Sequence, residues 1–162
     1  MNVRLASLAD LDTASAIYAR ARVFMRENGN PTQWGDSYPS LDLIRSDILG
    51  ENLYIIEDSE GTAAGLFAFF PNGDPDYNVI NGAWLNDEPY AAIHRIASSG
   101  AHKGVFSHIL DFCLARSSNI KVDTHAQNTV MQSVLKKHGF SLCGTITADG
   151  SEFLAFQFSR CM

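Results

Sequence analysis

The stretch IHRIASSGAHKGVFSHIL, from Ile93 to Leu110, changes its hydrophobic period from that of a short strand to that of a helix. Tyr90–Ala97 mixes apolar and polar side chains over the length of a strand, and Ser98–Lys103 is small and polar. Apolar residues then recur at helical spacing over Val105–Cys113. The stretch therefore predicts a strand, a loop and a helix.

The loop in this stretch has features that suit a phosphate ligand. The N–H groups at the start of an α-helix have no partner within the helix and carry a partial positive charge. Gly100 and Gly104 would let a ligand approach the backbone closely. Glycine is also common in strand-to-helix turns that bind nothing, so both interpretations stay open at this point.

A second unit of the same kind follows. Ile120–Thr124 is β-prone, and a helical pattern runs from Asn128 to His138, where Gly139 ends it and the aromatic Phe140 follows. Asn128 is a good N-cap for this helix.

The order of strand, glycine loop, helix, strand, Asn-capped helix, Gly-Phe and strand resembles the GNAT superfamily of acyl-CoA-dependent N-acetyltransferases. The phosphate loop of that family reads Gln/Arg-x-x-Gly-x-Gly/Ala and corresponds here to Ala101–Phe106. Gly104 matches the pattern, whereas Ala101 and Phe106 depart from it. The resemblance spans nearly the whole chain, and its order of elements and the segment Asn128–Phe140 carry it more than the loop does.

This resemblance implies a fold and a cofactor. The two central strands, Tyr90–Ala97 and Ile120–His125, are expected to run parallel and to splay apart, so that the pantetheine arm of acetyl-CoA enters the gap between them. A strand N–H near Ile96 is expected to polarise the thioester carbonyl. The residues expected to contact the cofactor are Ile96, Ala97, Ala101, His102, Lys103, Gly104, Val105, Phe106, Ser107 and Asn128.

Acyl transfer to an amine needs a group that takes the proton of the ammonium, whose pKa is about 10. His94 and His125 lie on the two strands of the expected gap, and both are candidates for this base. The alternative for either histidine alone is a hydrogen-bonded structural side chain, which is the more common role. Asp123 ranks lower because strand alternation can direct it to the opposite face. Leu135 stands where many GNAT enzymes have a tyrosine that protonates the thiolate, so another donor would be needed.

The resemblance also suggests where the acceptor amine binds. The connector NGNPTQWGDSYPS, residues 28–40, and the turn-rich segment PNGDPDYNVINGAWLNDEPY, residues 71–90, are the irregular parts that would border it. The alternatives are that Trp34 packs over a loop and that Trp84 plugs the core. The candidate acceptor residues are Asn30, Gln33, Trp34, Tyr77 and Trp84.

The other patterns complete the predicted fold. An amphipathic helix follows the Ser7–Asp10 capping pair and ends near Gly29, and a second helix covers Leu41–Leu49. Further strands are expected at Val3–Leu5, Leu53–Glu57, Ala63–Phe70, Ser141–Thr147 and Glu152–Phe158. We expect an α/β fold with about seven strands in a mixed, mostly antiparallel sheet and about four helices.

Composition sets further expectations. The 162 residues fit a single domain, 1–162, and the net charge of −6 argues against nucleic-acid binding and mildly favours a cationic substrate. Cys113, Cys143 and Cys161 are odd in number and lack metal-site spacing, so we expect reduced thiols and no metal. With neither a signal peptide nor a membrane span, a cytoplasmic protein is expected. The resemblance makes a homodimer plausible.

The sequence thus predicts an acetyl-CoA-dependent N-acetyltransferase that acts on a small-molecule or peptide amine by direct attack on the thioester. One alternative is a non-catalytic acyl-CoA-binding sensor or regulatory module on the same fold. Another is an unrelated nucleotide-binding α/β domain for ATP or NAD. The sequence lacks both the Walker phosphate loop and the three-glycine dinucleotide fingerprint.

Overall fold

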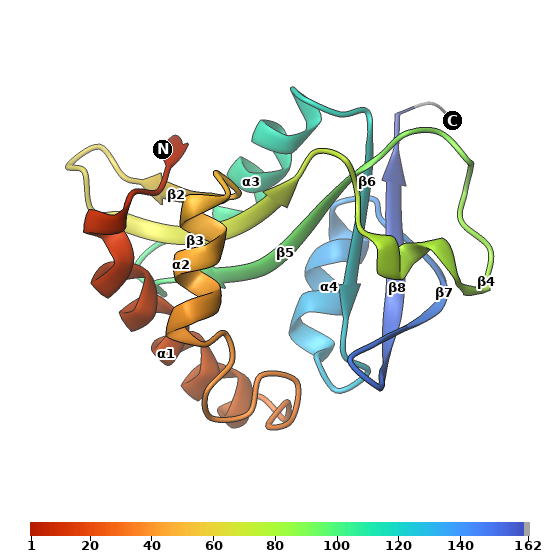
Figure 1. Ribbon diagram of the computed structural model, residues 1–162, viewed down its shortest axis with the longest axis horizontal. Helices are drawn as coiled ribbons and strands as arrows, with labels where there is room; N and C mark the ends of the chain where they lie inside the picture. Colours follow the sequence, from red (N-terminus) through yellow and green to blue (C-terminus); the bar gives the residue numbers. More distant parts are fainter. Residues whose placement is uncertain (161–162) are drawn as a thin grey trace.

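The computed structural model describes residues 1–160, and Cys161 lies outside the described residues. The four α-helices and seven of the eight strands closely follow the predicted ranges (Figure 1). In chain order they are β1 (Asn2–Leu5), α1 (Leu11–Glu27), α2 (Leu41–Leu49), β2 (Leu53–Glu57), β3 (Ala63–Phe70), β4 (Asn81–Gly82), β5 (Ala91–Ser98), α3 (Val105–Leu114), β6 (Asn119–Thr124), α4 (Thr129–Lys137), β7 (Ser141–Ala148) and β8 (Ser151–Ser159).

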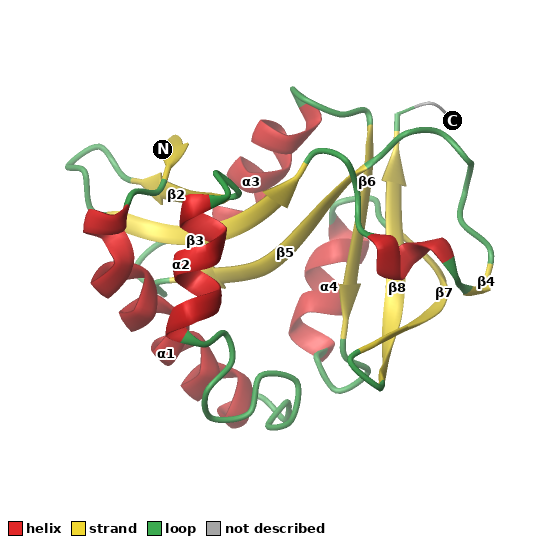
Figure 2. Ribbon diagram, viewed as in Figure 1, coloured by secondary structure: helices red, strands yellow, loops and turns green. Residues whose placement is uncertain are grey.

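All these strands form one sheet in the order β1-β2-β3-β5-β6-β8-β7-β4. Neighbouring strands are antiparallel except for the central pair, β5 and β6, which is parallel. The sheet has one strand more than the sequence predicted, because two residues of the 71–90 segment, Asn81 and Gly82, pair with β7. Figure 2 shows that the rest of this segment is mostly loop with one short helical turn.

The central parallel strands splay apart, as the resemblance implied. β5 and β6 are in register only where Ala91 faces Ile120 and Ala92 faces Lys121. Beyond these two pairs the strands diverge, and their carboxyl ends point away from each other in Figure 1. The backbone of each strand beyond the paired residues is therefore not bonded to the other.

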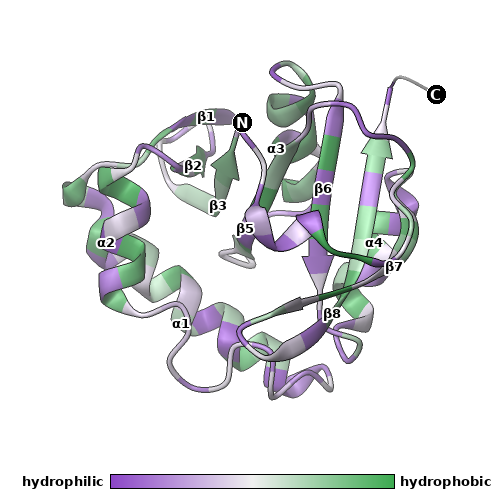
Figure 3. Cartoon of the chain, turned by 45° about the vertical axis from the view of Figure 1, so that its right-hand side comes forward, coloured by the Kyte–Doolittle hydropathy of each residue, from purple (hydrophilic) through white to green (hydrophobic). Residues whose placement is uncertain are grey.

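Helices cover both faces of the sheet. α1 and α2 pack on one face of the N-terminal half, around Tyr18, Ile44, Ile55 and Leu66. On the opposite face α3 and α4 enclose the main core, which includes Ile93, Ile109, Val122, Leu135 and Phe156. Helix α3 is mostly hydrophobic in Figure 3, as expected for a helix with six buried residues. The 71–90 segment closes a third cluster around Tyr77, Ala92 and Ile146.

Side-chain caps fix the helix starts that border the connector and the central gap. The Ser40 hydroxyl accepts from the N–H of Leu43 at 3.1 Å, which begins α2. The Asn128 side chain accepts from the N–H of Met131 at 3.0 Å and begins α4, as the sequence predicted. No helix within residues 1–160 is long and apolar enough to cross a bilayer.

Candidate active site

A cleft of about 1140 Å³ opens where β5 and β6 diverge. Its floor is the second half of β5 and the end of β6, and the start of α3 and one side of α4 form one wall. The opposite wall comes from α1, the connector of residues 28–40 and the turn at Asp74–Asp76. The cleft thus passes through the sheet from the face of α3 and α4 to the face of α1 and α2.

The start of α3 forms one end of this cleft. Gly104 precedes the helix in the left-handed conformation, with φ of +74°, which glycine adopts without strain. A Cβ at this position would meet no atom within 4 Å, so the space beside Gly104 is open. Because the first N–H groups of a helix favour anions, this end of the cleft suits a phosphate group.

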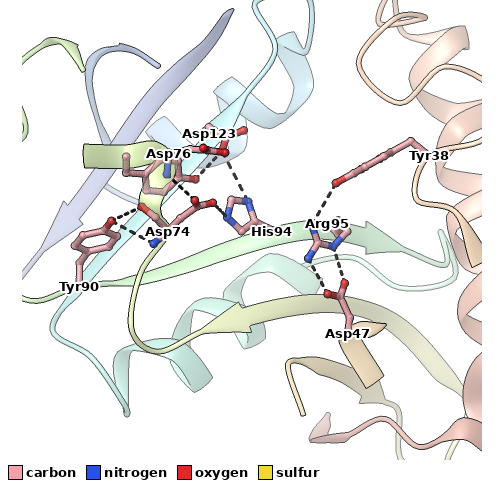
Figure 4. Close-up of polar contacts among 9 residues, drawn as sticks. Tyr38, Asp47, Asp74, Asp76, Tyr90, His94, Arg95 and Asp123 are labelled. Atoms are coloured by element: carbon pink, nitrogen blue, oxygen red, sulfur yellow. Dashed lines mark hydrogen bonds and ion pairs between the residues drawn. The ribbon is translucent and has the colours of Figure 1, made fainter. Parts of the chain in front are cut away.

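His94 lines the cleft and lies between two carboxyl groups from different elements (Figure 4). Its Nε2 is 2.7 Å from Oδ2 of Asp74, which belongs to the 71–90 segment. Its Nδ1 is 3.8 Å from Oδ2 of Asp123 on β6. The first contact is a hydrogen bond and the second is too long to be one, so the two ring nitrogens have different environments.

The two carboxyl groups differ in their preferred charge. The hydrogen bond from His94 lowers the pKa of Asp74, and the N–H of Asp76 stabilises the same carboxylate. Burial raises the pKa of Asp123, although the charge of His94 opposes this rise. The hydroxyl of Tyr77 donates to Asp123 at 2.6 Å, and burial raises the pKa of Tyr77 well above its usual value.

These environments assign a proton-accepting atom to His94. An ionised Asp74 only accepts hydrogen bonds, so the neutral imidazole carries its proton on Nε2 and keeps a lone pair on Nδ1. Once Nδ1 takes a proton, the imidazolium is bonded to the Asp74 carboxylate, which stabilises its charge. The pair can therefore act as an oriented general base.

Ten of the seventeen predicted site residues line the cleft. Those that do are His94, Ile96, Ala97, His102, Gly104, Val105, Phe106, Asn128, Gln33 and Trp34. The predicted residues that are not among the cleft-lining ones are His125, Ala101, Lys103, Ser107, Asn30, Tyr77 and Trp84. Their assignment as site residues stays a prediction.

Several of these residues outside the cleft have structural contacts. His125 packs edge-on against Phe153, and its Nδ1 is buried without a hydrogen-bond partner among the described residues. The Trp84 indole donates to the carbonyl of Tyr77 at 2.9 Å, and its ring lies against the Lys121 ammonium. Trp84 thus packs against the third hydrophobic cluster. Of the two roles that the sequence left open for Trp84, substrate binding and core packing, this contact agrees with core packing.

The connector residues meet the start of α4 at the cleft. The side-chain oxygen of Gln33 accepts from Asn30 at 3.0 Å and from Asn128 at 3.1 Å. Trp34 packs edge-on against the buried Tyr18 and also lines the cleft, so packing and pocket formation both apply to it. Asn128 joins the cap of α4 to the connector.

Leu135, which stands where many GNAT enzymes have a tyrosine, does not face the cleft. Leu135 is fully buried in the main core and does not border the cleft. One turn later His138 lines the cleft, but its Nδ1 bonds to the carbonyl of Val134 and its Nε2 to the hydroxyl of Ser107. Hence α4 presents His138 rather than a phenol.

Sequence reasoning missed Asp74 and ranked Asp123 low. Asp74 is 20 residues from His94, within a segment that has no regular period, so no spacing rule connects the two. Tyr77 and Asp123 were both noted in the sequence, but not as partners. Within residues 1–160 no group of three or more His, Cys, Asp or Glu side chains could hold a metal ion.

Comparisons with known proteins bear on the fold. No protein-family profile and no curated protein matches the sequence. A GNAT-family acetyltransferase from Streptococcus agalactiae has a similar structure, with a TM-score of 0.88, 29% identity, and alignment over 98% of this chain and 95% of that chain.

Two further solved structures share the fold at lower identity. A GNAT-family acetyltransferase from Listeria monocytogenes has a TM-score of 0.72 and 19% identity over 98% of this chain and 94% of that chain. A ribosomal-protein-alanine N-acetyltransferase from Brucella melitensis has a TM-score of 0.64 and 17% identity over 98% and 99%.

Proposed function

We propose, from the GNAT fold that this chain has, that the protein transfers the acetyl group of acetyl-CoA to a primary amine. Its similarity to acetyltransferases supports acetyltransferase activity in general. The single observation that carries the proposal of acetyl transfer to an amine is the cleft between β5 and β6. The N-terminus of α3 and the hydrogen-bonded His94 both line this cleft.

The residues of the cleft fit acetyl-CoA. Open space beside Gly104 at the start of α3 can receive the diphosphate, and the diverging backbones of β5 and β6 can bond to the amides of the pantetheine arm. The hydroxyl oxygen of Thr124, at the end of β6 in the floor of the cleft, is buried without a hydrogen-bond partner among residues 1–160. A buried polar atom of this kind is expected to bond to a ligand.

When bound, acetyl-CoA supplies a thioester whose carbonyl carbon accepts the amine. The acceptor arrives as an ammonium and first releases one proton to solvent. During attack Nδ1 of His94 takes a second proton from the nitrogen, while Asp74 holds the Nε2–H of the ring. The N–H of Ile96 on the same strand stabilises the negative charge of the carbonyl oxygen.

The carbon–sulfur bond then breaks and the thiolate leaves. His94 is the group that we assign to return the proton to sulfur, because Leu135 has no proton to donate and His138 is bonded to Val134 and Ser107. The net reaction converts the ammonium and the thioester into an amide, a thiol and one proton in solution.

The acceptor is a small-molecule or peptide amine that enters from the side of the connector and of the 71–90 segment. Asp74 and Asp76 both border this side, and a cationic amine is attracted to their negative potential. Trp34 supplies an aromatic wall there.

The test is an assay of acetyl-CoA turnover with a panel of primary amines. Turnover is measured by the release of free thiol, and the product is identified by mass spectrometry. The wild-type protein is expected to acetylate at least one amine, and His94→Gln to lower kcat about a hundredfold. His125→Gln makes the same substitution at the other candidate base, which does not line the cleft, and a loss of kcat in this variant alone would move the base assignment to His125. Binding of acetyl-CoA without an acetylated product from any amine would instead favour a sensor on the same fold.

A further inference from the structure

The residue after His94 has an unusual backbone. Arg95 has a φ of +51°, in the left-handed region that non-glycine residues seldom adopt. The register between β3 and β5 shifts here, because Leu66 faces Ala97 and Ala68 faces His94. Two residues of β5 therefore stand opposite one of β3, which is a β-bulge. A non-glycine residue in this conformation costs about 1–2 kcal/mol, so other contacts must hold it.

The side chain of Arg95 is held by two elements from the first third of the chain. Its Nε and a terminal nitrogen donate to the two carboxylate oxygens of Asp47 on α2, at 2.6 and 2.9 Å. Only 12% of the Arg95 side chain and 7% of the Asp47 side chain are exposed. The remaining guanidinium nitrogen donates to the Tyr38 hydroxyl in the connector at 3.2 Å (Figure 4). A two-pronged contact of this kind fixes direction as well as distance.

The backbone of Arg95 is held as well. The hydroxyl of Tyr18, a buried residue of α1, donates to the carbonyl oxygen of Arg95 at 2.8 Å. Helix α1, the connector and helix α2 therefore all bond to one residue of β5. We name the set Tyr18, Tyr38, Asp47 and Arg95 the Arg95 clamp.

The clamp lies between the two groups assigned to the chemistry. His94 precedes Arg95 and Ile96 follows it, and all three line the cleft. Figure 4 shows His94 directed to Asp74 and Asp123, and Arg95 directed to the other side, to Asp47 and Tyr38. A bulge re-aims the side chains and N–H groups beside it, so the angle at Arg95 sets the directions of both neighbours.

We propose that Arg95 is a positioning residue for the acetyl transfer, a role that rests on the proposed function. The clamp holds the bulge in the conformation that directs His94 and the N–H of Ile96 into the cleft. The clamp also bonds Tyr38, which lines the cleft, to the same strand. The distance between the connector, where the acceptor would bind, and β5, where the thioester would lie, is thereby fixed.

The test compares Asp47→Asn, Arg95→Lys and Tyr38→Phe with the wild-type protein. Arg95→Lys keeps the charge and loses the planar fork, and Tyr38→Phe removes one hydroxyl from a partly exposed ring, so it leaves the core intact. We expect Asp47→Asn and Arg95→Lys to lower kcat about ten- to a hundredfold, because small displacements of catalytic groups cost this much. The dissociation constant of coenzyme A is expected to stay within about twofold, a change of roughly 0.4 kcal/mol.

A purely structural ion pair would give a different result. Arg4→Lys, which weakens the pair with Asp10 at the far edge of the sheet, is the control and should lower the melting temperature without changing kcat. If Asp47→Asn and Arg95→Lys keep wild-type kcat while folded, the clamp is structural only and the proposal is overturned.

A second readout does not depend on turnover. The imidazole proton signals of His94, assigned with His94→Gln, should shift at fixed pH in Asp47→Asn and Arg95→Lys but not in Arg4→Lys. If the wild-type protein acetylates no amine, the proposed function fails while these signals still test the clamp. Unchanged His94 signals in both clamp variants would contradict positioning by Arg95.

Discussion

At His94 the two ring nitrogens have unequal partners, and this inequality determines what the residue can do. Asp74 holds Nε2 at hydrogen-bond distance, whereas Asp123 is 3.8 Å from Nδ1. A lone histidine in a cleft is free to rotate and to exchange tautomers. With Asp74 in place, the tautomer that carries its proton on Nε2 is favoured, and in the proposed reaction Nδ1 is the atom that takes the proton of the acceptor.

The role of Asp74 leads to a prediction about charge. In Asp74→Asn the amide oxygen can still accept from Nε2, but the negative charge that stabilises the imidazolium is gone. We expect kcat to fall about tenfold or more, which corresponds to ~1.4 kcal/mol on the barrier. Steady-state kinetics at several pH values measure this effect.

The matched control comes from the same turn. Asp76→Asn makes the same change of charge two residues away, on an exposed side chain, and it leaves in place the backbone N–H of Asp76 that donates to Asp74. An equal loss of kcat in both variants would mean that the rate depends on the overall negative charge of this turn rather than on the hydrogen bond between Asp74 and His94.

At the residue scale, the sequence predicted His94 from its place on a central strand and Gln33 and Trp34 from the connector. All three line the cleft, and their roles in catalysis and substrate binding stay predictions. Asp74 could not be predicted, because an irregular segment of 20 residues carries no period that fixes which side chain returns to the sheet. The left-handed backbone conformation of Arg95 could not be predicted either, because a β-bulge depends on the pairing with the opposite strand rather than on local sequence.

At the scale of elements, the start of α3 is where the proposed diphosphate lies. Gly104→Ala introduces a methyl group into open space and a strained φ. We expect the dissociation constant of coenzyme A to rise about tenfold, equivalent to ~1.4 kcal/mol, because the methyl group would compete with the ligand. Isothermal titration measures the affinity.

Backbone strain alone can be separated from this effect. Gly61→Ala, in the hairpin between β2 and β3, has a nearly equal φ of +79° and the same open surroundings, but it lies outside the cleft. Both variants are expected to lose similar stability, about 1 kcal/mol. Equal weakening of coenzyme A binding in both would argue against a ligand at Gly104.

The turn between β1 and α1 makes stability depend on pH. The Arg4 guanidinium, with help from the N–H of Ser7, holds the pKa of Asp10 well below its ordinary value. A lowered pKa in the folded state stabilises the protein above the ordinary carboxyl pKa near 4, and this stability is lost as the pH falls below that value. The wild-type protein should therefore exceed Asp10→Asn in unfolding free energy at pH 7, by about 1 kcal/mol, and the difference should shrink below about pH 4.

Urea unfolding at pH 7 and at pH 3 measures this difference. Asp42→Asn is the control, because Asp42 forms an exposed pair with Arg45 on α2 and 94% of its side chain is exposed. Such a pair contributes little, so Asp42→Asn should change the unfolding free energy only slightly at either pH. A constant difference for Asp10→Asn at both pH values would contradict the role given to its charge.

At the scale of the whole molecule, the order of elements was predictable and the contents of the cleft were not. The predicted helices and most strands match the structure, since each has a clear period and a cap such as Ser40 or Asn128. The extra strand β4 escaped prediction because two residues make no pattern. The depth of the cleft depends on how far β5 and β6 diverge, which is a property of the complete sheet.

The whole-molecule account predicts a selective ligand. A ligand at 100 times its dissociation constant stabilises the folded state by about 2.7 kcal/mol. Acetyl-CoA should therefore raise the melting temperature by several degrees, whereas ATP and NAD should leave it unchanged. A larger shift with NAD than with acetyl-CoA would favour the nucleotide-binding alternative.

The central claim is that the gap between β5 and β6 receives the arm of acetyl-CoA, and amide hydrogen exchange with and without coenzyme A tests it most directly. We predict that coenzyme A slows exchange in residues 93–98 and 104–107 and leaves residues 41–57, which form α2 and β2, unchanged. Coenzyme A that binds by titration and yet protects neither of the first two segments would contradict the account.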